Sequence, residues 1–515
     1  MIASEPFLRE MWDRLARGEV HDKGDLQRVK TELVRRHCLI GIPPDSEILL
    51  GAPDSLRNAF VDLLRVKPTR SASGVAVVTV MTPPHACPHG TCIYCPGGPR
   101  FGTPQSYTGT EPAARRAAFH AYDPYGQTVA RLEQLHRTGH ATDKIDFIIL
   151  GGEFSALDPA FRQDFVKRCF DGLNGSTAAD LEEAHARNET AVSRCIGLTI
   201  ETKPDRFVGP EVRTCLSLGT TRVELGVQTT HDDVLRLVNR GHTDADSRAA
   251  TRGAKDAGLK VGYHMMPGLP GNDVDRDLAS FRALFEDPDY RPDMLKIYPT
   301  LVLEGTGLYT MWARGRFRPM STEDAVGLVA KVKAIVPPYV RIQRIQREIG
   351  ADVILGGPTK GDLRVRAQRR LEEDGGRCAC IRCREIGLGN RRGPPERIDL
   401  QRLEYEASGG REVFLSFEDP GATTLIGYAR LRICDAGAFL RELRVVGQVV
   451  PIAGDSGDRW QHRGYGARLL AECERIACEE EGRREILVTS GVGVRGYYRR
   501  FGYARRGPYM VKALP

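Results

Sequence analysis

Three cysteines in the segment "PHACPHGTCIYCPGG" have the residue type and spacing of a metal centre. Cys87, Cys92 and Cys95 follow one another as C-x4-C-x2-C. Thiolates with this spacing can ligate three irons of a cubic iron–sulfur cluster and leave its fourth iron open. They can equally hold zinc if His85 or His89 completes a tetrahedron. The spacing alone leaves both alternatives open.

A second group of cysteines, in "RCACIRC", has the spacing C-x-C-x2-C. Cys378, Cys380 and Cys383 with one distant ligand would form a closed zinc site, and an auxiliary iron–sulfur cluster is the alternative. We favour zinc, because a redox-neutral site suits a connector between two domains. His37 and Cys38 are candidates for the fourth ligand by residue type alone.

The remaining cysteines and the composition indicate a cytoplasmic protein of two or three domains. The chain has 515 residues, of which 41% are hydrophobic and 27% are charged. The charged N-terminus lacks a secretion signal, and no segment approaches the roughly 18 apolar residues that cross a bilayer. We therefore expect no membrane contact, and clustered thiols that bind metal. Seven scattered cysteines are expected to be small buried residues: Cys38, Cys169, Cys195, Cys215, Cys434, Cys473 and Cys478.

Seven short apolar runs alternate with helical segments over about 280 residues. Their continuous apolar character predicts strands buried on both faces of a parallel sheet. The alternation predicts a β/α barrel or an open relative of one, in which chemistry gathers where the strands end. The first cysteine group directly follows the first run. The runs span 75–81, 145–153, 195–202, 222–229, 260–270, 294–305 and 339–346.

The pattern divides the chain into four parts and places most of its positive charge in one of them. We predict a helical region over 1–70, the partial barrel over 71–350, a basic connector with the second cysteine group over 351–397, and a second α/β domain over 398–515. Residues 341–397 hold 14 Lys+Arg and 8 Asp+Glu, a net charge of +6 out of +7 for the whole chain. This localised charge indicates a polyanionic partner.

The second α/β domain contains a glycine loop before a predicted helix. The loop is "QHRGYG", and the helix is expected over 467–481. Exposed N–H groups and the helix dipole at such a position attract a pyrophosphate, and glycines let it approach. The pattern resembles the Q/R-x-x-G-x-G/A motif of the GNAT acetyltransferases, which implies acetyl-CoA binding.

The first cysteine loop resembles that of the radical S-adenosylmethionine (SAM) enzymes, with Tyr94 before the last cysteine. The resemblance implies a 4Fe-4S cluster whose open iron is chelated by SAM, which is then cleaved to a 5′-deoxyadenosyl radical. "GGE", which is Gly151, Gly152 and Glu153, corresponds to that family's motif for the methionyl amino group.

Several longer segments narrow the resemblance to the catalytic subunits of Elongator, which modify the wobble uridine of tRNA. "CIYCPGGP", "IETKPD", "VELGVQTTHDDVL" and "KIYPTLVLEGTGLY" carry this resemblance, which spans roughly residues 65–515. Two features depart from the family. Glu153 stands where many members have threonine, and the C-x4-C spacing is shorter than in eukaryotic members.

This resemblance implies an acetyl-CoA site built from both domains. Lys144, Tyr497 and Tyr498 are its candidate catalytic residues; one tyrosine is expected to be buried and the other to line the thioester pocket. Glu442 is expected to hold a strand bulge rather than act as a base. The candidate cofactor contacts are Lys144, Glu442, Leu443, Arg444, Val445, Trp460, Gln461, His462, Arg463, Gly464, Tyr465, Gly466, Tyr497 and Tyr498.

The implied reaction uses both cofactors. The SAM-derived radical takes a hydrogen from the acetyl methyl group, the carbon radical adds to C5 of uridine 34, and thioester hydrolysis leaves a carboxymethyl group. The resemblance leaves open whether further Elongator-type subunits are needed. The helical region is a candidate tRNA contact, as are six arginines near the connector: Arg344, Arg347, Arg364, Arg366, Arg369 and Arg370.

Two other functions are compatible with parts of the sequence. The chain could be a protein lysine acetyltransferase in which the barrel is a scaffold, or a non-enzymatic tRNA-binding protein with degenerate cofactor sites. The complete first cysteine group argues against both, because a scaffold has no need of an open iron position.

Overall fold

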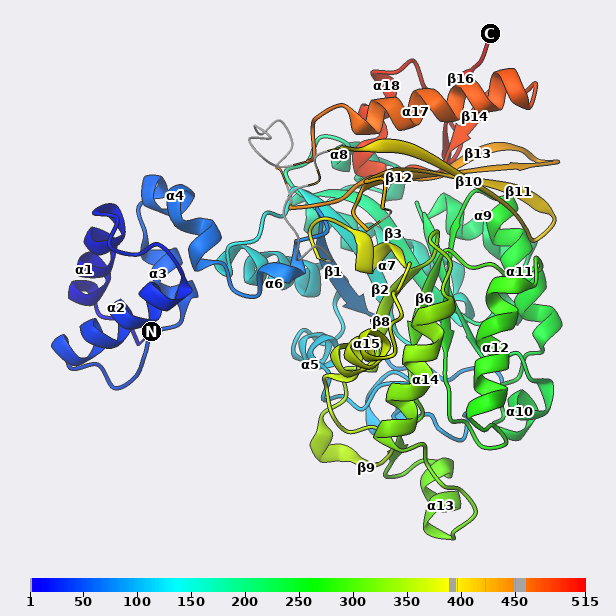
Figure 1. Cartoon of the computed structure of the whole chain (residues 1–515), viewed down its shortest axis with the longest axis horizontal. Coiled ribbons are helices and arrows are strands. Elements are labelled where there is room, and N and C mark those ends of the chain that lie inside the picture. The colour runs from blue at the N-terminus through cyan, green and yellow to red at the C-terminus, as the bar shows by residue number, and fades with distance from the viewer. Residues whose placement is uncertain (1, 389–394, 396, 422, 449, 451–459) are drawn as a thin grey trace.

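The computed structural model describes residues 2–388, 395, 397–421, 423–448, 450 and 460–515. Four N-terminal helices stand to one side of the rest of the chain (Figure 1): α1 Glu5–Ala16, α2 Lys23–Arg36, α3 Asp45–Gly51 and α4 Asp54–Leu64. They bury their own apolar core, which includes Phe7, Met11 and Leu33. Among the described helices, none combines the length and apolar character needed to cross a membrane.

The central part of the molecule is a seven-stranded parallel sheet with the order β1-β2-β3-β4-β5-β6-β8. Its strands succeed one another in chain order, with helical connections between them, which confirms the predicted partial β/α barrel. The strands are β1 Ala76–Met81, β2 Lys144–Leu150, β3 Arg194–Thr202, β4 Arg222–Gln228, β5 Lys260–Met265, β6 Met294–Ile297 and β8 Arg341–Ile345.

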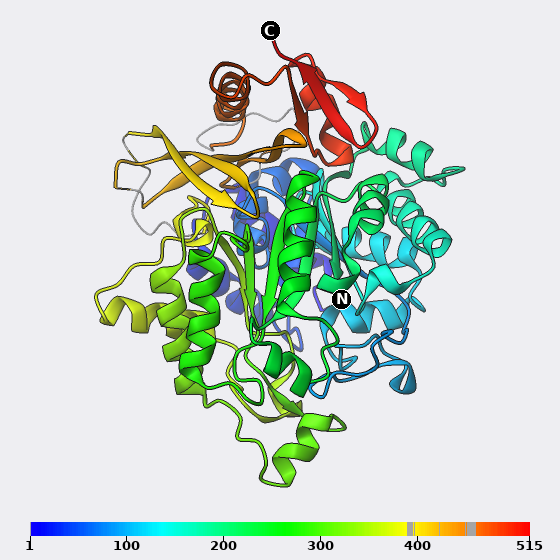
Figure 2. The same cartoon turned by 90° about the vertical axis from the view of Figure 1, so that its right-hand side faces the viewer.

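The helices of this part lie mainly on the outer face of the sheet (Figures 1 and 2). Aliphatic and aromatic side chains from strands and helices form one continuous core between the two layers. The helices are α5 Pro112–Phe119, α6 Pro124–Arg137, α7 Pro159–Asn174, α8 Leu181–Asn188, α9 Gly209–Ser217, α10 Asp232–Leu237, α11 Asp244–Asp256, α12 Val274–Glu286, α13 Gly307–Ala313, α14 Thr322–Ile335, α15 Leu363–Glu373 and α16 Ile381–Arg384.

Two of the predicted strands end earlier than the apolar runs suggested. The run 260–270 is a strand only to Met265, and the run 294–305 divides, because β6 ends at Ile297, two residues before Pro299. Proline has no N–H to donate to a sheet ladder. Val302–Leu303 instead forms β7, which pairs with β9, Ile354–Gly356.

The C-terminal part is a second seven-stranded sheet with the order β10-β11-β12-β13-β14-β16-β15, antiparallel except for the pair β13–β14. The helix predicted over 467–481 begins earlier, as α17 Tyr465–Arg475, and continues as a wider π-helical turn over Ile476–Glu480. The other elements are β10 Asp399–Ala407, β11 Gly410–Glu418, β12 Leu425–Cys434, β13 Gly437–Val445, β14 Glu485–Val488, α18 Arg495–Arg499, β15 Ala504–Arg506 and β16 Tyr509–Ala513.

A bulge in β13 separates this strand from its parallel neighbour. Glu442 pairs with Arg430 while Leu440 pairs with Leu431, so Arg441 is the extra residue. Bulges bend a strand and increase its local twist. The parallel pairing of β13 with β14 accordingly covers only Phe439 and Leu440. Beyond the bulge the two strands diverge and leave space for a ligand between them.

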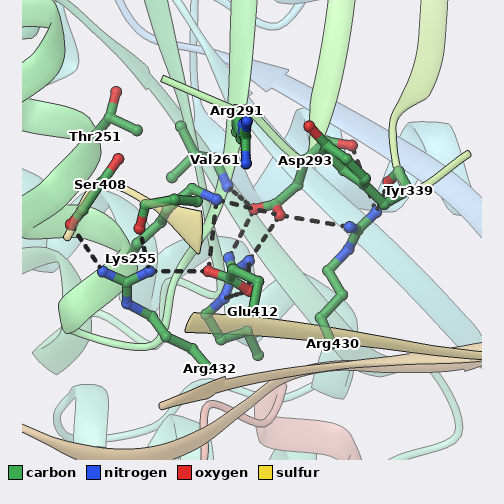
Figure 3. Close-up of polar contacts among 12 residues, drawn as sticks. Thr251, Lys255, Val261, Arg291, Asp293, Tyr339, Ser408, Glu412, Arg430 and Arg432 are labelled. Atoms are coloured by element: carbon green, nitrogen blue, oxygen red, sulfur yellow. Dashed lines mark hydrogen bonds and ion pairs between the residues drawn. The ribbon is translucent and has the colours of Figure 1, made fainter. Parts of the chain in front are cut away.

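The second sheet lies across the amino-terminal ends of the barrel strands (Figures 1 and 2), and a buried cluster of charges joins the two parts (Figure 3). Arg441 donates two hydrogen bonds of 2.7 Å to Asp293 of the barrel, and it also bonds Glu412 of β11 at 2.7 Å. Arg432 donates to Glu412 at 3.0 Å. Lys255 of α11 lies 3.5 Å from Glu412. We call these five residues together with Arg430 the interface cluster.

Candidate functional site

The first cysteine group lies on the long loop after β1, at the carboxyl edge of the barrel. Cys87, Cys92 and Cys95 all line one cavity of about 160 Å³ at that edge, which we call the cluster cavity. Backbone contacts fix the loop, since the Cys87 N–H donates to the side chain of Gln105 at 2.6 Å and the Ser106 N–H donates to the Cys95 thiol at 3.1 Å. The loop therefore presents three thiols to one enclosed space.

The arrangement of these thiols fits an iron–sulfur cluster better than a single zinc ion. Zinc ligands must converge on one point, whereas the thiolates of a cubic cluster each bind a different iron. The three sulfurs do not form a group within 4.8 Å of one another, although they share the cavity. His85, one proposed zinc ligand, has both ring nitrogens within hydrogen-bond distance of backbone carbonyls. His89, the other, lies 3.3 Å from the Cys92 sulfur and within 4.8 Å of ligand atoms of Cys87 and Glu153. Arg240 lies 3.9 Å from the Cys92 sulfur.

The "GGE" segment ends β2 next to the cysteine loop. A Cβ on Gly151 would lie 2.0 Å from the Thr82 hydroxyl, so only glycine fits there. Glu153 is 1% exposed and lines the same cavity. Neither of its oxygens accepts a hydrogen bond from a described residue, although Arg206 lies 3.4 Å away. Burial raises the pKa of this carboxyl. An unsatisfied buried carboxylate at this position fits the amino group of SAM.

The inner face of the barrel carries charged residues that the sequence analysis did not identify. Lys296 of β6 lies between Glu201 of β3, at 3.0 Å, and Glu224 of β4. His264 of β5 bonds Glu224 at 2.9 Å. Burial opposes the charge of Glu224, but Lys296 and His264 outweigh it and hold its pKa well below the usual range. With Arg222 of β4, these residues form what we call the axial cluster.

A second cavity, of about 1000 Å³, lies between the two parts of the molecule at the amino-terminal edge of the barrel. The diverging strands β13 and β14, the start of α17, and α18 line it from the C-terminal side. Lys144, Asp146, Arg222 and Lys260 line it from the barrel side. Most of the predicted acetyl-CoA contacts meet here: Lys144, Glu442, Leu443, Arg444, Val445, Gln461, His462, Gly464, Tyr465, Gly466, Tyr497 and Tyr498.

Lys144 connects the barrel to the glycine loop. Its ammonium donates to the Gln461 side chain at 2.8 Å and to the Val450 carbonyl at 2.6 Å. Gln461 in turn donates to the Val445 carbonyl at 3.1 Å. Burial lowers the pKa of Lys144 to about 8. This lysine therefore holds the loop at the start of α17 while its charge faces the cavity.

The start of α17 has the geometry of an anion site. Gly464 caps the helix with φ 84°, which favours glycine, and Gly466 has the Tyr497 hydroxyl 2.9 Å from where its Cβ would be. Free N–H groups of a first helical turn point into such a space. Trp460 and Arg463 stack on each other with 5.5 Å from guanidinium to ring centre, and they are not among the described residues that line the cavity.

The two tyrosines of α18 differ in burial. Tyr498 packs in the core of the second sheet, while Tyr497 is partly exposed beside Gly466. Glu442 is ion-paired with Arg430 at 2.8 Å and accepts a hydrogen bond from Tyr428. Burial opposes its charge, but Arg430 outweighs burial and lowers the pKa of Glu442 to about 2. An anchored carboxylate of this kind is a poor proton acceptor at neutral pH.

Known proteins resemble this chain over its full length. It is 49% identical to the tRNA uridine(34) acetyltransferase of Methanocaldococcus jannaschii, over 99% of this chain and 97% of that one. It is 44% identical to Elongator complex protein 3 of Homo sapiens, over 96% and 95% of the two chains. The chain belongs to the Elongator complex protein 3 family.

The family models and a solved structure agree with the fold of this Elongator complex protein 3 family member. The models of the ELP3 N-terminal domain, the radical SAM superfamily and the radical SAM C-terminal domain match residues 5–72, 81–282 and 292–373. The structure of the archaeal Methanocaldococcus infernus Elp3 with an N-terminal deletion superposes with a TM-score of 0.76 at 45% identity, over 86% of this chain and all of that one.

The second cysteine group of this Elongator complex protein 3 family member differs in geometry from the first. The sulfurs of Cys378, Cys380 and Cys383 lie within 4.8 Å of one another, as mononuclear metal ligands do. Among the described residues no histidine or further cysteine joins them. His37 bonds Glu10 in the helical region, away from this group.

Of the seven scattered cysteines expected to be buried, five are buried, Cys478 is half-buried and Cys38 is exposed. Cys38, expected to be buried, is exposed just after α2. The sequence around it, "RRHCLIGIPP", reads as an apolar run, but the chain leaves the helix at His37 and Cys38 takes a positive φ of 52° on the surface.

The six predicted RNA arginines lie in three different environments. Arg344 and Arg347 line the cluster cavity, and Arg347 bonds the Ser106 carbonyl beside Cys95. Arg364 turns inward, donates to the Ile342 carbonyl at 3.0 Å, and has a pKa lowered by burial to about 10. The others lie on α15, where Arg369 is exposed and two arginines pair with acidic neighbours: Arg366 with Glu323, and Arg370 with Asp374.

Proposed function

We propose that this protein modifies the wobble uridine of tRNA by attaching a carboxymethyl group that comes from acetyl-CoA. One observation carries the proposal: a cavity lined by three cysteines and a cavity with the lining expected for an acyl-CoA lie at opposite ends of one barrel in one chain. The name of the M. jannaschii relative, a tRNA uridine(34) acetyltransferase, supports the substrate and the position.

The residues of the first cavity suit a cluster and SAM. Cys87, Cys92 and Cys95 would hold a 4Fe-4S cluster, and Glu153 would accept a hydrogen bond from the amino group of SAM. When bound, this pair of groups supplies a carbon radical that can remove a hydrogen from an unactivated methyl group. The cavity is lined by apolar residues such as Ile148 and Leu150 as well as by ion pairs, and a site shielded from solvent limits side reactions of reactive intermediates.

The residues of the second cavity suit a coenzyme A thioester. The start of α17, at Gly464 and Gly466, would bind the pyrophosphate through backbone N–H groups. The divergence of β13 from β14 exposes backbone groups of Leu443 and Val445 that can pair with an extended amide chain. Lys144 adds positive charge and orders the loop through Gln461.

The tRNA would enter at the carboxyl edge of the barrel. Arg344 and Arg347 line the cluster cavity there and can contact phosphates next to an unstacked base. On α15, exposed Arg369 extends the positive charge beyond the cavity, and Arg366 and Arg370 would exchange their partners Glu323 and Asp374 for phosphates. We further propose that Cys378, Cys380 and Cys383 hold zinc, because their sulfurs converge on one point.

Two single substitutions test the proposal. Cys92→Ala removes a sulfur from the cavity and should abolish formation of modified nucleoside in anaerobic reactions with tRNA, SAM, reductant and acetyl-CoA. Cys169→Ala is the matched control, since Cys169 is buried in the barrel core away from the cavity, and it should retain activity. Full activity of Cys92→Ala, or acetylated protein in place of modified tRNA, would contradict the proposal.

A further inference from the structure

The two cavities are separated by a single layer of side chains inside the barrel. On β2, Asp146 lines the second cavity, which we call the acyl-CoA cavity, and Ile148, two residues further on, lines the cluster cavity. On β4 the same step leads from Arg222 to Glu224. Two residues advance a strand by about 7 Å. One layer of the barrel interior therefore has a cavity on each side.

This layer consists of an ion pair with incomplete hydrogen bonding. Arg222 and Glu224 are 3% and 1% exposed, and the Arg222 Nε lies 3.3 Å from Glu224 Oε1. Neither of these two atoms makes a hydrogen bond to a described residue. Arg222 also donates to Asp146 at 3.3 Å. Buried polar atoms normally have partners, so the unsatisfied pair has capacity to bond a visiting polar group.

Two glycines make room for the side chains that form this layer. Gly197 of β3 and Gly262 of β5 lie within strands and do not have positive φ angles, so backbone geometry does not explain them. Glycine inside a strand weakens it and often marks a place where a ligand comes close. A Cβ at Gly262 would lie 3.2 Å from Cγ of Glu224, and one at Gly197 would lie 3.2 Å from the Thr221 hydroxyl and 3.6 Å from Asp146.

The opposite ends of the barrel also pose a problem of distance. The proposed reaction joins a methyl group of a thioester bound at the amino-terminal edge to a base held at the carboxyl edge. The strands between the two edges are six to nine residues long for β1 to β5, or about 20–30 Å. The acyl group must therefore travel around the barrel or through it.

We propose that the barrel interior is a passage through which the acyl end of the thioester reaches the cluster cavity, and that Arg222 and Glu224 gate it. The idea rests on the proposed function. The guanidinium of Arg222 moves off Glu224 and donates to the thioester carbonyl. Lys296 and His264 bond Glu224 on the side of the cluster cavity, so the carboxylate keeps these partners while the gate is open. Gly262 has no side chain that would hinder movement of Glu224, and Gly197 has none beside Asp146.

The passage can be tested by covalent trapping in the full chain without cofactors. An Ile148→Cys variant places a thiol just beyond the gate. Bromoacetyl-CoA should alkylate it, with the thiolate forming a C–S bond at the α-carbon and bromide leaving. Peptide mass spectrometry should find the adduct, and excess CoA should slow its formation at least tenfold. Cys195, which is buried on β3, should stay unmodified.

Two controls decide the route that the reagent takes. Adding Gly262→Leu fills the gate and should suppress alkylation at least tenfold, while CoA binding measured by calorimetry is retained. Bromoacetamide, which is small enough to enter from the mouth of the cluster cavity, should label both variants equally. Labelling by bromoacetyl-CoA that is insensitive to CoA, or that survives Gly262→Leu, would overturn the passage.

The outcomes separate the passage from the proposed function. If the chain does not bind CoA at all, the proposed function fails. If CoA binds but gives no CoA-sensitive adduct beyond the gate, only the passage fails. Should Ile148→Cys not fold, Gly262→Leu alone decides: it should keep SAM cleavage and CoA binding while tRNA modification falls at least tenfold, and undiminished modification would overturn the passage.

Discussion

The barrel carries two buried clusters of charge, and they differ in how their carboxylates are bonded. In the interface cluster, Asp293 and Glu412 each accept hydrogen bonds from two or more donors and border no cavity among the described residues, although Lys255 Nζ and Arg430 Nη1 lack a hydrogen-bond partner and Arg441 lines the acyl-CoA cavity. In the axial cluster, Arg222 and Glu224 each leave an atom without a hydrogen bond and face a cavity.

Buried charge has two different roles in this fold. Ionised groups are costly to remove from water, so a chain retains them where they fix an arrangement or where they act on a ligand. The interface cluster fixes the second sheet on the amino-terminal edge of the barrel (Figure 3). The axial cluster keeps bonding capacity in reserve beside both cavities. We expect substitutions in the first to affect stability and substitutions in the second to affect activity.

The largest effect is expected from Asp293→Asn in the interface cluster. The change removes one of the two carboxylates that compensate Arg441 and Lys255 and leaves Glu412 to face both cations, so the free energy of unfolding should fall by about 3–5 kcal/mol. Denaturant unfolding measures it. Asp289→Asn is the matched control, because that carboxylate is 61% exposed and pairs only at the surface with Arg248; it should cost less than about 1 kcal/mol.

The same residue predicts a dependence of stability on pH. Burial opposes ionisation of Asp293, but Arg441 and Lys255 outweigh it and lower its pKa. Its contribution to stability is therefore present above the unfolded value of about 3.9 and is lost as pH falls further. The Asn variant should lose less stability in acid than the unaltered chain does. Equal acid sensitivity of the two would contradict the assignment.

Glu224→Gln in the axial cluster is expected to lower stability less than Asp293→Asn does, and to lower activity more. Glu201, 3.0 Å from Lys296, still balances its charge, so the cost should be only about 1–3 kcal/mol. Formation of modified nucleoside should fall about 100-fold, while SAM cleavage without tRNA persists. Under conditions where Asp293→Asn remains folded, that variant should modify tRNA normally. If Asp293→Asn instead lowered activity while Glu224→Gln lowered only stability, the roles assigned to the two clusters would be contradicted.

The smallest effect is expected at Lys144. With a pKa of about 8 it loses its charge as pH rises through that value, while a pyrophosphate stays anionic. Acetyl-CoA affinity should therefore fall by about tenfold, or 1.4 kcal/mol, between pH 7 and pH 9.5. Lys144→Arg stays charged and should remove the dependence, as calorimetry at several pH values would measure. An unchanged pH profile in the Arg variant would exclude Lys144 as its origin.

Much of the barrel could be predicted from the sequence because its strands are buried on both faces. Continuous apolar runs located all seven strands of the first sheet to within a few residues, apart from the stops at prolines. The second sheet was harder. β10 has most of its side chains exposed, and its apolar alternation is confined to Leu403, Tyr405 and Ala407, so the signal is weak; the short β15 and β16 were also missed.

The cysteine loop and the glycine loop were predictable because their chemistry depends on local spacing. The axial cluster was missed because its members come from four strands and meet only in the folded barrel. A signal did exist. Arg222 and Glu224 interrupt an apolar strand at alternate positions, as Asp146 does on β2, and an apolar core would not tolerate such residues. Charged residues at alternate positions within an apolar strand therefore indicate that the interior of the barrel takes part in function.

Deuterium transfer shows whether the acetyl methyl group becomes the carboxymethyl group of the tRNA. The protein, reconstituted with iron and sulfide without oxygen, is incubated with tRNA, SAM, reductant and acetyl-CoA that carries three deuterium atoms on its methyl group. The account predicts carboxymethyluridine that retains two deuterium atoms, and 5′-deoxyadenosine that gains one. Modified nucleoside without deuterium, or deuterated acetyl groups on protein lysines and none on tRNA, would contradict it.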